Sequence, residues 1–161
     1  AAVSILVLGL GNTLMSDDAL GVRAVEQLQR DYIFPVGVKV VDGGTLGLDL
    51  LPFIEEADRA LIIDALEMQA EPGKVFRLEG DEVPRAFASK LSVHQMGLQD
   101  LLAVADLQGY APRELVFWGV QPASIEMKME LSPPVAAALD ELVDSVVKEL
   151  KRWGVMLDKA V

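Results

Sequence analysis

The hydrophobic and polar positions of this chain follow two periods. Short apolar or β-branched runs predict strands at residues 3–8, 38–41, 59–64 and 114–120. The runs at 3–8 and 59–64 are continuous, which is typical of strands covered on both faces. Residues 74–78 alternate between apolar and charged side chains after a Pro72-Gly73 turn, which predicts a half-exposed edge strand.

Apolar residues at helical spacing separate these strands. Helices are predicted at 18–32, 46–57, 94–107 and 132–154. The first places Val22, Val25 and Leu28 on one face, and the third does so with Leu98, Leu101, Leu102 and Ala105. Ser132 is expected to cap the last helix, which has Pro133 in its first turn and ends at Gly154.

This alternation predicts an α/β fold. We expect a single domain spanning residues 1–161, built as a three-layer α/β/α sandwich. Its core is a twisted, mostly parallel sheet of about five strands with helices on both faces. The chain contains no internal repeat, low-complexity segment or linker that would divide it.

Composition narrows the class of partner. The formal net charge of −11 disfavours nucleic acid, whose phosphates would be repelled, and leaves room for cations or a basic protein segment. The absence of cysteine excludes disulfides, thiolate metal ligands and a thiol nucleophile. No apolar run is long enough for membrane insertion, and no signal segment precedes the first strand, so we expect a soluble, cytoplasmic protein.

Acidic residues follow three of the predicted strands. The pair Asp17-Asp18 follows the first strand, Asp42 the second and Asp64 the third. Ligands of open α/β sheets collect beyond the carboxyl ends of the strands. Clustered carboxylates repel one another unless a cation lies between them. The pattern therefore predicts a cation site at this edge.

The only histidine, His94, begins a predicted helix, where the helix dipole favours its neutral, metal-binding form. Together Asp18, Asp64 and His94 would offer two oxygens and one nitrogen, a set that suits Zn, Ni, Mn or Fe(II). The sequence also allows structural roles for these acids and for the histidine. Asp17 is a candidate N-cap, Asp42 a candidate cap of the Gly43-Gly44 turn, and His94 a candidate surface or packing residue.

The glycines near the N-terminus resemble part of a dinucleotide-binding motif, but they fit it less well than the acids fit a cation site. Gly9 and Gly11 would turn the chain off the strand, and Gly21 would let the first helix approach the sheet. Asp42 stands about 20 residues further on, where such motifs carry a ribose-binding acid. The chain nevertheless has Leu14 in place of the third glycine, and an acid pair follows it.

Five segments, read in order, carry a resemblance: GLGNTLMSDDALG, DGGTLGLDLL, LIIDALE, HQMGL and GVQP. Within residues 3–122 the chain resembles the hydrogenase maturation endopeptidases, which trim the large subunit of NiFe hydrogenases. The resemblance implies that Asp18, Asp64 and His94 contact nickel, and that Asp42 is a further recurrent acid at the site. Ala19 stands where many relatives have glycine.

The resemblance also implies a substrate. It would be a folded, nickel-loaded precursor of the large subunit, from which a short C-terminal extension is removed. The nickel would be carried by the substrate, and another divalent metal such as Zn or Cd could occupy the same ligands. The metal would polarise the scissile carbonyl or activate a water, and Asp42 or Asp17 would accept a proton. An enzyme that docks a large partner is expected to be a monomer.

Two other functions fit the same residues. A nickel-checking chaperone would use the trio Asp18, Asp64 and His94 as a sensor and recruit another protease. A self-sufficient metallohydrolase would hold its own zinc there, and stoichiometric zinc in the purified protein would indicate it.

Overall fold

The computed structural model describes residues 4–44, 47–84 and 93–160, and for residues 47–48 and 93–99 it describes the backbone alone. Five strands form the main sheet, in the order β3-β1-β4-β6-β5. They are β1 (Ile5–Leu10), β3 (Val38–Gly44), β4 (Arg59–Ala65), β5 (Val75–Glu79) and β6 (Glu114–Val120). Only β5 runs antiparallel to its neighbour. The predicted mostly parallel sheet and its edge strand are confirmed.

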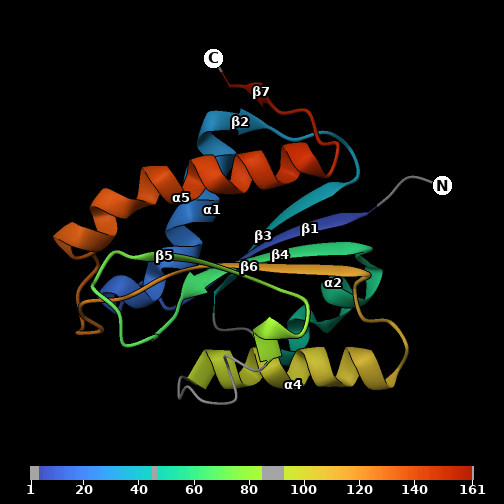
Figure 1. The fold of residues 1–161 in the computed structure, drawn as a ribbon, viewed down its shortest axis with the longest axis horizontal. Helices are drawn as coiled ribbons and strands as arrows, with labels where there is room; N and C mark the ends of the chain where they lie inside the picture. The colour runs from blue at the N-terminus through green and yellow to red at the C-terminus, as the bar shows by residue number, and fades with distance from the viewer. Residues whose placement is uncertain (1–3, 45–46, 85–92, 161) are drawn as a thin grey trace.

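Helices cover both faces of this sheet (Figure 1). α1 (Leu20–Asp31) and α5 (Pro133–Arg152) lie on one face, and α2 (Leu51–Glu56) and α4 (Val93–Leu107) lie on the other. Two short strands, β2 (Tyr32–Ile33) and β7 (Asp158–Lys159), pair outside the sandwich. None of the helices described here is long and apolar enough to cross a bilayer.

Two predicted helices begin differently from expectation. The first is preceded by a 3-10 turn, η1 (Ser16–Ala19), so α1 itself starts only at Leu20. The second divides into η2 (Gly47–Leu50) and α2, because Pro52 fits the first turn of a helix and sets the start of α2 at Leu51. Residue 46, where we expected that helix to begin, lies outside the described residues.

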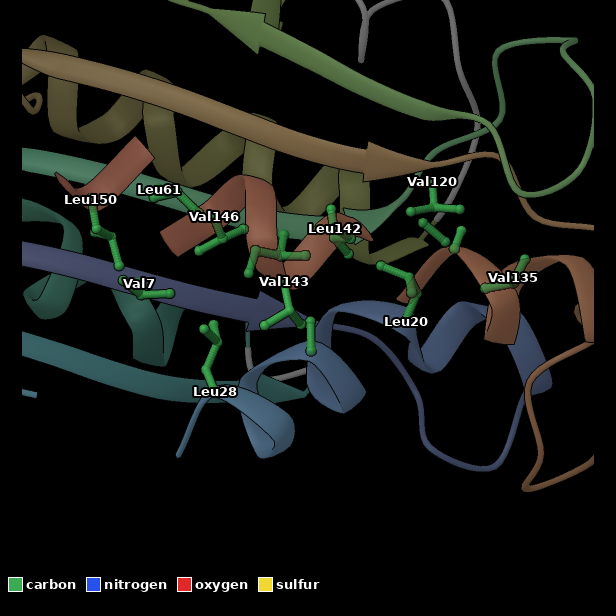
Figure 2. Close-up of a cluster of buried hydrophobic side chains, with 14 of the residues drawn as sticks. Val7, Leu20, Leu28, Leu61, Val120, Val135, Leu142, Val143, Val146 and Leu150 are labelled. Carbon is green, nitrogen blue, oxygen red and sulfur yellow. The ribbon is translucent and has the colours of Figure 1, made fainter. Parts of the chain in front are cut away.

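The sheet separates two apolar cores, because successive strand residues point to opposite faces. The core beneath α1 and α5 is drawn in Figure 2 and includes Val7, Leu28, Leu61, Leu142, Val146 and Leu150. The core toward α2 and α4 includes Leu6, Leu8, Ile62, Leu101 and Phe117. Both faces of the central strands are thus buried, as their continuous apolar sequences indicate.

Glycines allow α1 to lie unusually close to the sheet. A Cβ at Gly21 would clash with the backbone oxygen of Ile63, and one at Gly9 would clash with the backbone oxygen of Gly21. The predicted role of Gly21 is confirmed, whereas Gly9 lies inside β1 and does not turn the chain. Gly11 makes that turn, with a φ of 137°. This contact fixes the start of α1, and η1 before it, at the carboxyl edge of the sheet.

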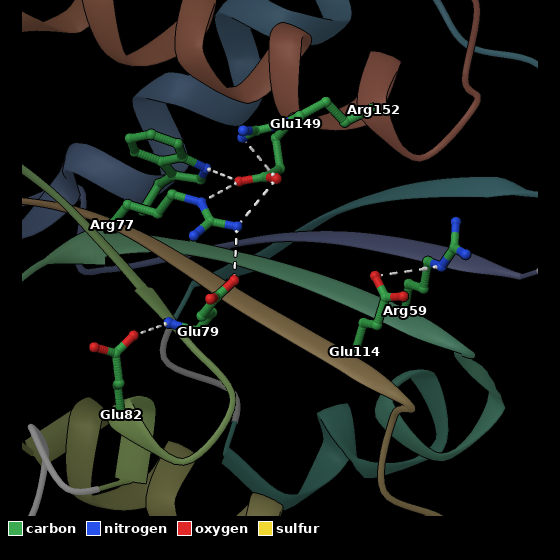
Figure 3. Close-up of polar contacts among 8 residues, drawn as sticks. Arg59, Arg77, Glu79, Glu82, Glu114, Glu149 and Arg152 are labelled. Carbon is green, nitrogen blue, oxygen red and sulfur yellow. Dashed lines mark hydrogen bonds and ion pairs between the residues drawn. The ribbon is translucent and has the colours of Figure 1, made fainter.

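A buried ionic cluster joins α5 to β5 and β6 (Figure 3). The Glu149 side chain is only 3% exposed. It accepts hydrogen bonds from Arg77 at 2.6 and 3.2 Å and from Trp118 at 3.1 Å, and it pairs with Arg152 at 2.8 Å. Burial by itself raises the pKa of Glu149, but the bonds and charges of Arg77, Arg152 and Trp118 outweigh it and lower that pKa.

We expect Glu149→Gln to lower the free energy of unfolding at pH 7 by roughly 1.5–3 kcal/mol, because charge-assisted hydrogen bonds are lost. A lowered folded-state pKa stabilises the protein above the unfolded value of 4.5, and this stabilisation disappears as the pH falls. The difference between the variant and the unmodified protein should therefore shrink below about pH 4.5. Urea titrations between pH 3 and 7 measure it, and a difference that stays constant over this range would contradict the prediction.

Candidate active site

The strand register brings two of the predicted acids to one edge of the sheet. Asp42 of β3 pairs with Gly9 of β1, and Gly9 pairs with Ile63 of β4. Asp64 is the next residue of β4, so both acids lie where their strands end. This is the carboxyl edge, the position at which parallel sheets bind ligands.

Asp64 is fully buried at this edge. Its Oδ1 accepts a hydrogen bond from the backbone N–H of Ala65 at 2.8 Å. Ile62 and Leu66 belong to the core toward α2 and α4, so strand alternation directs the Asp64 side chain to that same face. A buried carboxylate at a strand end has a high desolvation cost, which points to a chemical role rather than a folding one.

Asp18 lies in η1, which packs against β4. Its side chain is partly buried, and its Oδ2 accepts a hydrogen bond from the backbone N–H of Asn12 at 3.0 Å. Asn12 follows the Gly11 turn at the end of β1. The turn thus holds the Asp18 carboxylate at the carboxyl edge, beside the strand that carries Asp64.

His94 is the second residue of α4, on the face of the sheet toward which Asp64 is directed. Its side chain lies outside the described residues, so the predicted contact of His94 with Asp18 and Asp64 stays a prediction. Among the side chains that are described, no three His, Cys, Asp or Glu residues form a group able to hold a metal ion. Asp18 and Asp64 provide carboxylate oxygens, donors that suit divalent ions such as nickel or zinc.

Asp17 has a different role from its neighbour. Its fully buried carboxylate accepts four hydrogen bonds, from the N–H groups of Ala123, Ser124 and Ser132 and from the Ser132 hydroxyl, at 2.7–2.9 Å. Its own N–H donates to the Ser124 carbonyl at 3.1 Å. We call these contacts the Asp17 cluster. It fixes the segment between β6 and α5 against η1.

The Asp17 cluster corrects two predictions. Asp17 does not cap a helix, since its oxygens reach a segment more than 100 residues away in the chain. Ser132 does occupy the N-cap position of α5, but its hydroxyl donates to Asp17 and caps no helix N–H group. The two adjacent acids therefore divide their tasks, with Asp17 holding the backbone together and Asp18 lying at the carboxyl edge.

Asp42 lies at the edge but faces away from Asp64. It is exposed, and its Oδ1 accepts a hydrogen bond from the N–H of Gly44 at 3.0 Å. Val40, two residues earlier in β3, packs against the core beneath α1 and α5, so alternation directs Asp42 to that same face. The hydrogen bond supports the turn-capping alternative, and a proton-accepting role for Asp42 stays a prediction.

Gln121 is a structural residue of this edge to which the sequence assigned no role. It is buried, and its side-chain oxygen accepts hydrogen bonds from the N–H groups of Met68 and Ala70 at 2.8 and 3.2 Å. Its amide nitrogen donates to Glu67. Gln121 thereby holds the loop after β4, which begins just beyond Asp64. A polar residue directly after a buried strand, within the segment GVQP, is the signal that could have revealed it.

Comparison with known proteins shows similarity to hydrogenase maturation proteins. Residues 22–149 match the family described as HycI: hydrogenase maturation protease. The hydrogenase expression/formation protein HupD of Bradyrhizobium diazoefficiens is 43% identical over 157 residues, covering 96% of this chain and 82% of that protein. The hydrogenase 2 maturation protease of Escherichia coli is 41% identical over 152 residues, covering 94% of this chain and 93% of that protein.

Solved structures agree with the sequence matches. The hydrogenase maturating endopeptidase HybD from E. coli superposes with a TM-score of 0.94 at 39% identity, covering 97% of both chains. The NiFe hydrogenase maturation protease HybD from Thermococcus kodakarensis gives 0.73 at 32% identity, covering 90% of this chain and 97% of the other. The fold and most of the chain length are therefore shared with these proteins.

Proposed function

Because this chain belongs to the hydrogenase maturation protease family, we propose that it removes the C-terminal extension from the nickel-loaded precursor of a NiFe hydrogenase large subunit. Residues 22–149 match the family, and the E. coli hydrogenase 2 maturation protease, of which the match covers 93%, has the same description. The observation that supports the location of the chemistry is the fully buried Asp64 carboxylate at the end of β4.

We propose that Asp18, Asp64 and His94 recognise the nickel that the substrate brings. Asp18 and Asp64 lie on adjacent segments at the carboxyl edge, and His94 lies in the first turn of α4, on the face to which Asp64 points. The nickel would supply Lewis acidity to the scissile carbonyl or to an attacking water. The three side chains would orient it, so the cleavable peptide lies beside them only when the precursor is loaded.

Serine-type catalysis does not fit this chain. A Ser-His-Asp triad needs a histidine as general base, and the single histidine is His94, which the proposal assigns to nickel. No Gly-x-Ser-x-Gly segment occurs either. Recognition of the substrate's metal needs only the two carboxylates and the imidazole, so the proposed mechanism requires no nucleophilic side chain.

The test is cleavage of nickel-loaded and nickel-free large-subunit precursor by the purified protein. We expect a C-terminal peptide to be lost from the loaded precursor alone, because the empty one offers no ion to Asp18, Asp64 and His94. Mass spectrometry of the products measures this. Equal cleavage of both precursors would contradict nickel recognition while leaving the protease activity in place.

The same experiment separates the alternatives. Binding of loaded precursor without any cleavage would favour the nickel-checking chaperone. A metal analysis of the purified protein addresses the third function, since stoichiometric zinc would favour a metallohydrolase with its own ion.

A further inference from the structure

Four large apolar side chains are exposed beside the candidate site. They are Leu14 (56% exposed), Ile125 (61%), Met127 (83%) and Met129 (64%), and we call them the rim patch. Leu14 precedes η1, and the other three belong to the segment between β6 and α5. Exposed apolar side chains that gather in one place mark interaction surfaces more often than isolated ones do.

Backbone contacts bring the two halves of the rim patch together. Met15 and Lys128 form a parallel β-bridge, and the N–H of Ser16 donates to the Lys128 carbonyl at 2.7 Å. Leu14, Met127 and Met129 adjoin the bridged residues, so the bridge brings the two halves of the patch close together.

The rim patch is also held rigidly next to the carboxyl edge. The Asp17 cluster ties Ser124 and Ser132, at the two ends of the patch-bearing segment, to η1. The Ser16 hydroxyl donates to the Glu130 carbonyl at 2.9 Å within the same segment. Asp18 adjoins this cluster in sequence. A surface that is ordered before binding loses less entropy on binding.

We propose that the rim patch is the docking surface for an apolar, extended stretch of the large-subunit precursor close to its cleavage point. This inference rests on the proposed function, because it assigns the occupant from the site that the patch adjoins. Flexible, polarisable methionines suit contact with an apolar chain that is released after each turnover. A second copy of this protein at the same place would cover the carboxyl edge that the substrate must reach.

The test compares the double variant M127Q/M129Q with the control Met156→Gln. Met156 is exposed to a similar degree, 71%, but precedes β7 outside the sandwich. Glutamine preserves side-chain length and charge while removing apolar surface. We expect the double variant to weaken binding of the nickel-loaded precursor about tenfold or more. The value of kcat/KM should fall in parallel through KM, with kcat at saturation retained.

Binding and cleavage are measured separately, so that the two proposals can fail independently. Weaker binding by the double variant, with binding by the control unchanged, supports docking at the rim patch. Equal binding by all three proteins overturns it, as does absence of binding by the unmodified chain. If binding follows the prediction but the unmodified chain leaves the loaded precursor intact, the proposed proteolysis fails and the docking surface stands.

Discussion

Replacing Asp64 with Asn is expected to abolish cleavage of the nickel-loaded precursor, with a loss of about 100-fold or more, while the chain stays folded. Asn has nearly the same size as Asp and can still accept the hydrogen bond that Asp64 Oδ1 receives from the Ala65 N–H. It lacks the negative charge that would attract the divalent ion. The change therefore removes the charge of the carboxylate without creating a cavity. The measurement is the rate of product formation, followed by mass spectrometry.

The control for this prediction lies at the other end of the same strand. Asp58 immediately precedes β4, is exposed, and accepts a hydrogen bond from the Ser4 N–H at 3.2 Å. Asp58→Asn makes the same chemical change at the amino edge and should leave cleavage unaltered. Thermal unfolding of both variants checks that they are folded. Full processing activity in the Asp64 variant would remove that residue from the mechanism.

Replacing Asp17 with Ala should be the most destabilising change at the carboxyl edge. It leaves three N–H groups and one hydroxyl, all in part-buried hydrogen bonds, without their acceptor. A fully buried donor left unsatisfied costs roughly 1–3 kcal/mol. We expect the free energy of unfolding to fall by more than about 3 kcal/mol, a large share of the 5–15 kcal/mol typical of a domain. Urea denaturation measures the change.

The neighbouring residue provides the contrast. Asp18→Ala should reduce cleavage strongly but destabilise the protein less than the Asp17 variant does, because Asp18 is partly exposed to water. A stability loss at position 18 equal to that at position 17 would show that the two acids do not divide their tasks. Unfolding and cleavage are therefore measured on both variants.

Local sequence was sufficient for most of the fold. β6 has the predicted bounds, because its apolar residues stand between polar segments on both sides. The edge position of β5 was predicted from its alternating apolar and charged side chains, which are typical of a strand with one face exposed to solvent. Gly21 was predicted correctly because close packing of a helix on a sheet needs a residue without a side chain.

Local sequence predicted only part of the candidate site. Asp64 could be located, since a charge directly after a buried apolar run has no folding reason to be there. The role of Asp17 could not, because its partners lie 106–115 positions away and no local pattern connects them. The role of Gln121 was not predicted for the same reason, because its side-chain hydrogen-bond partners in the loop after β4 lie 51–54 positions earlier in the chain.

The long-range attachment of Asp17 has a consequence during synthesis of the protein. The carboxylate finds its last partner, Ser132, only after all five strands of the main sheet have left the ribosome. A growing or truncated chain can collapse around its apolar core earlier, yet its η1 still lacks the hydrogen bonds of the Asp17 cluster. Competence to cut should therefore arise late in translation, and incomplete chains should be inert towards their partner.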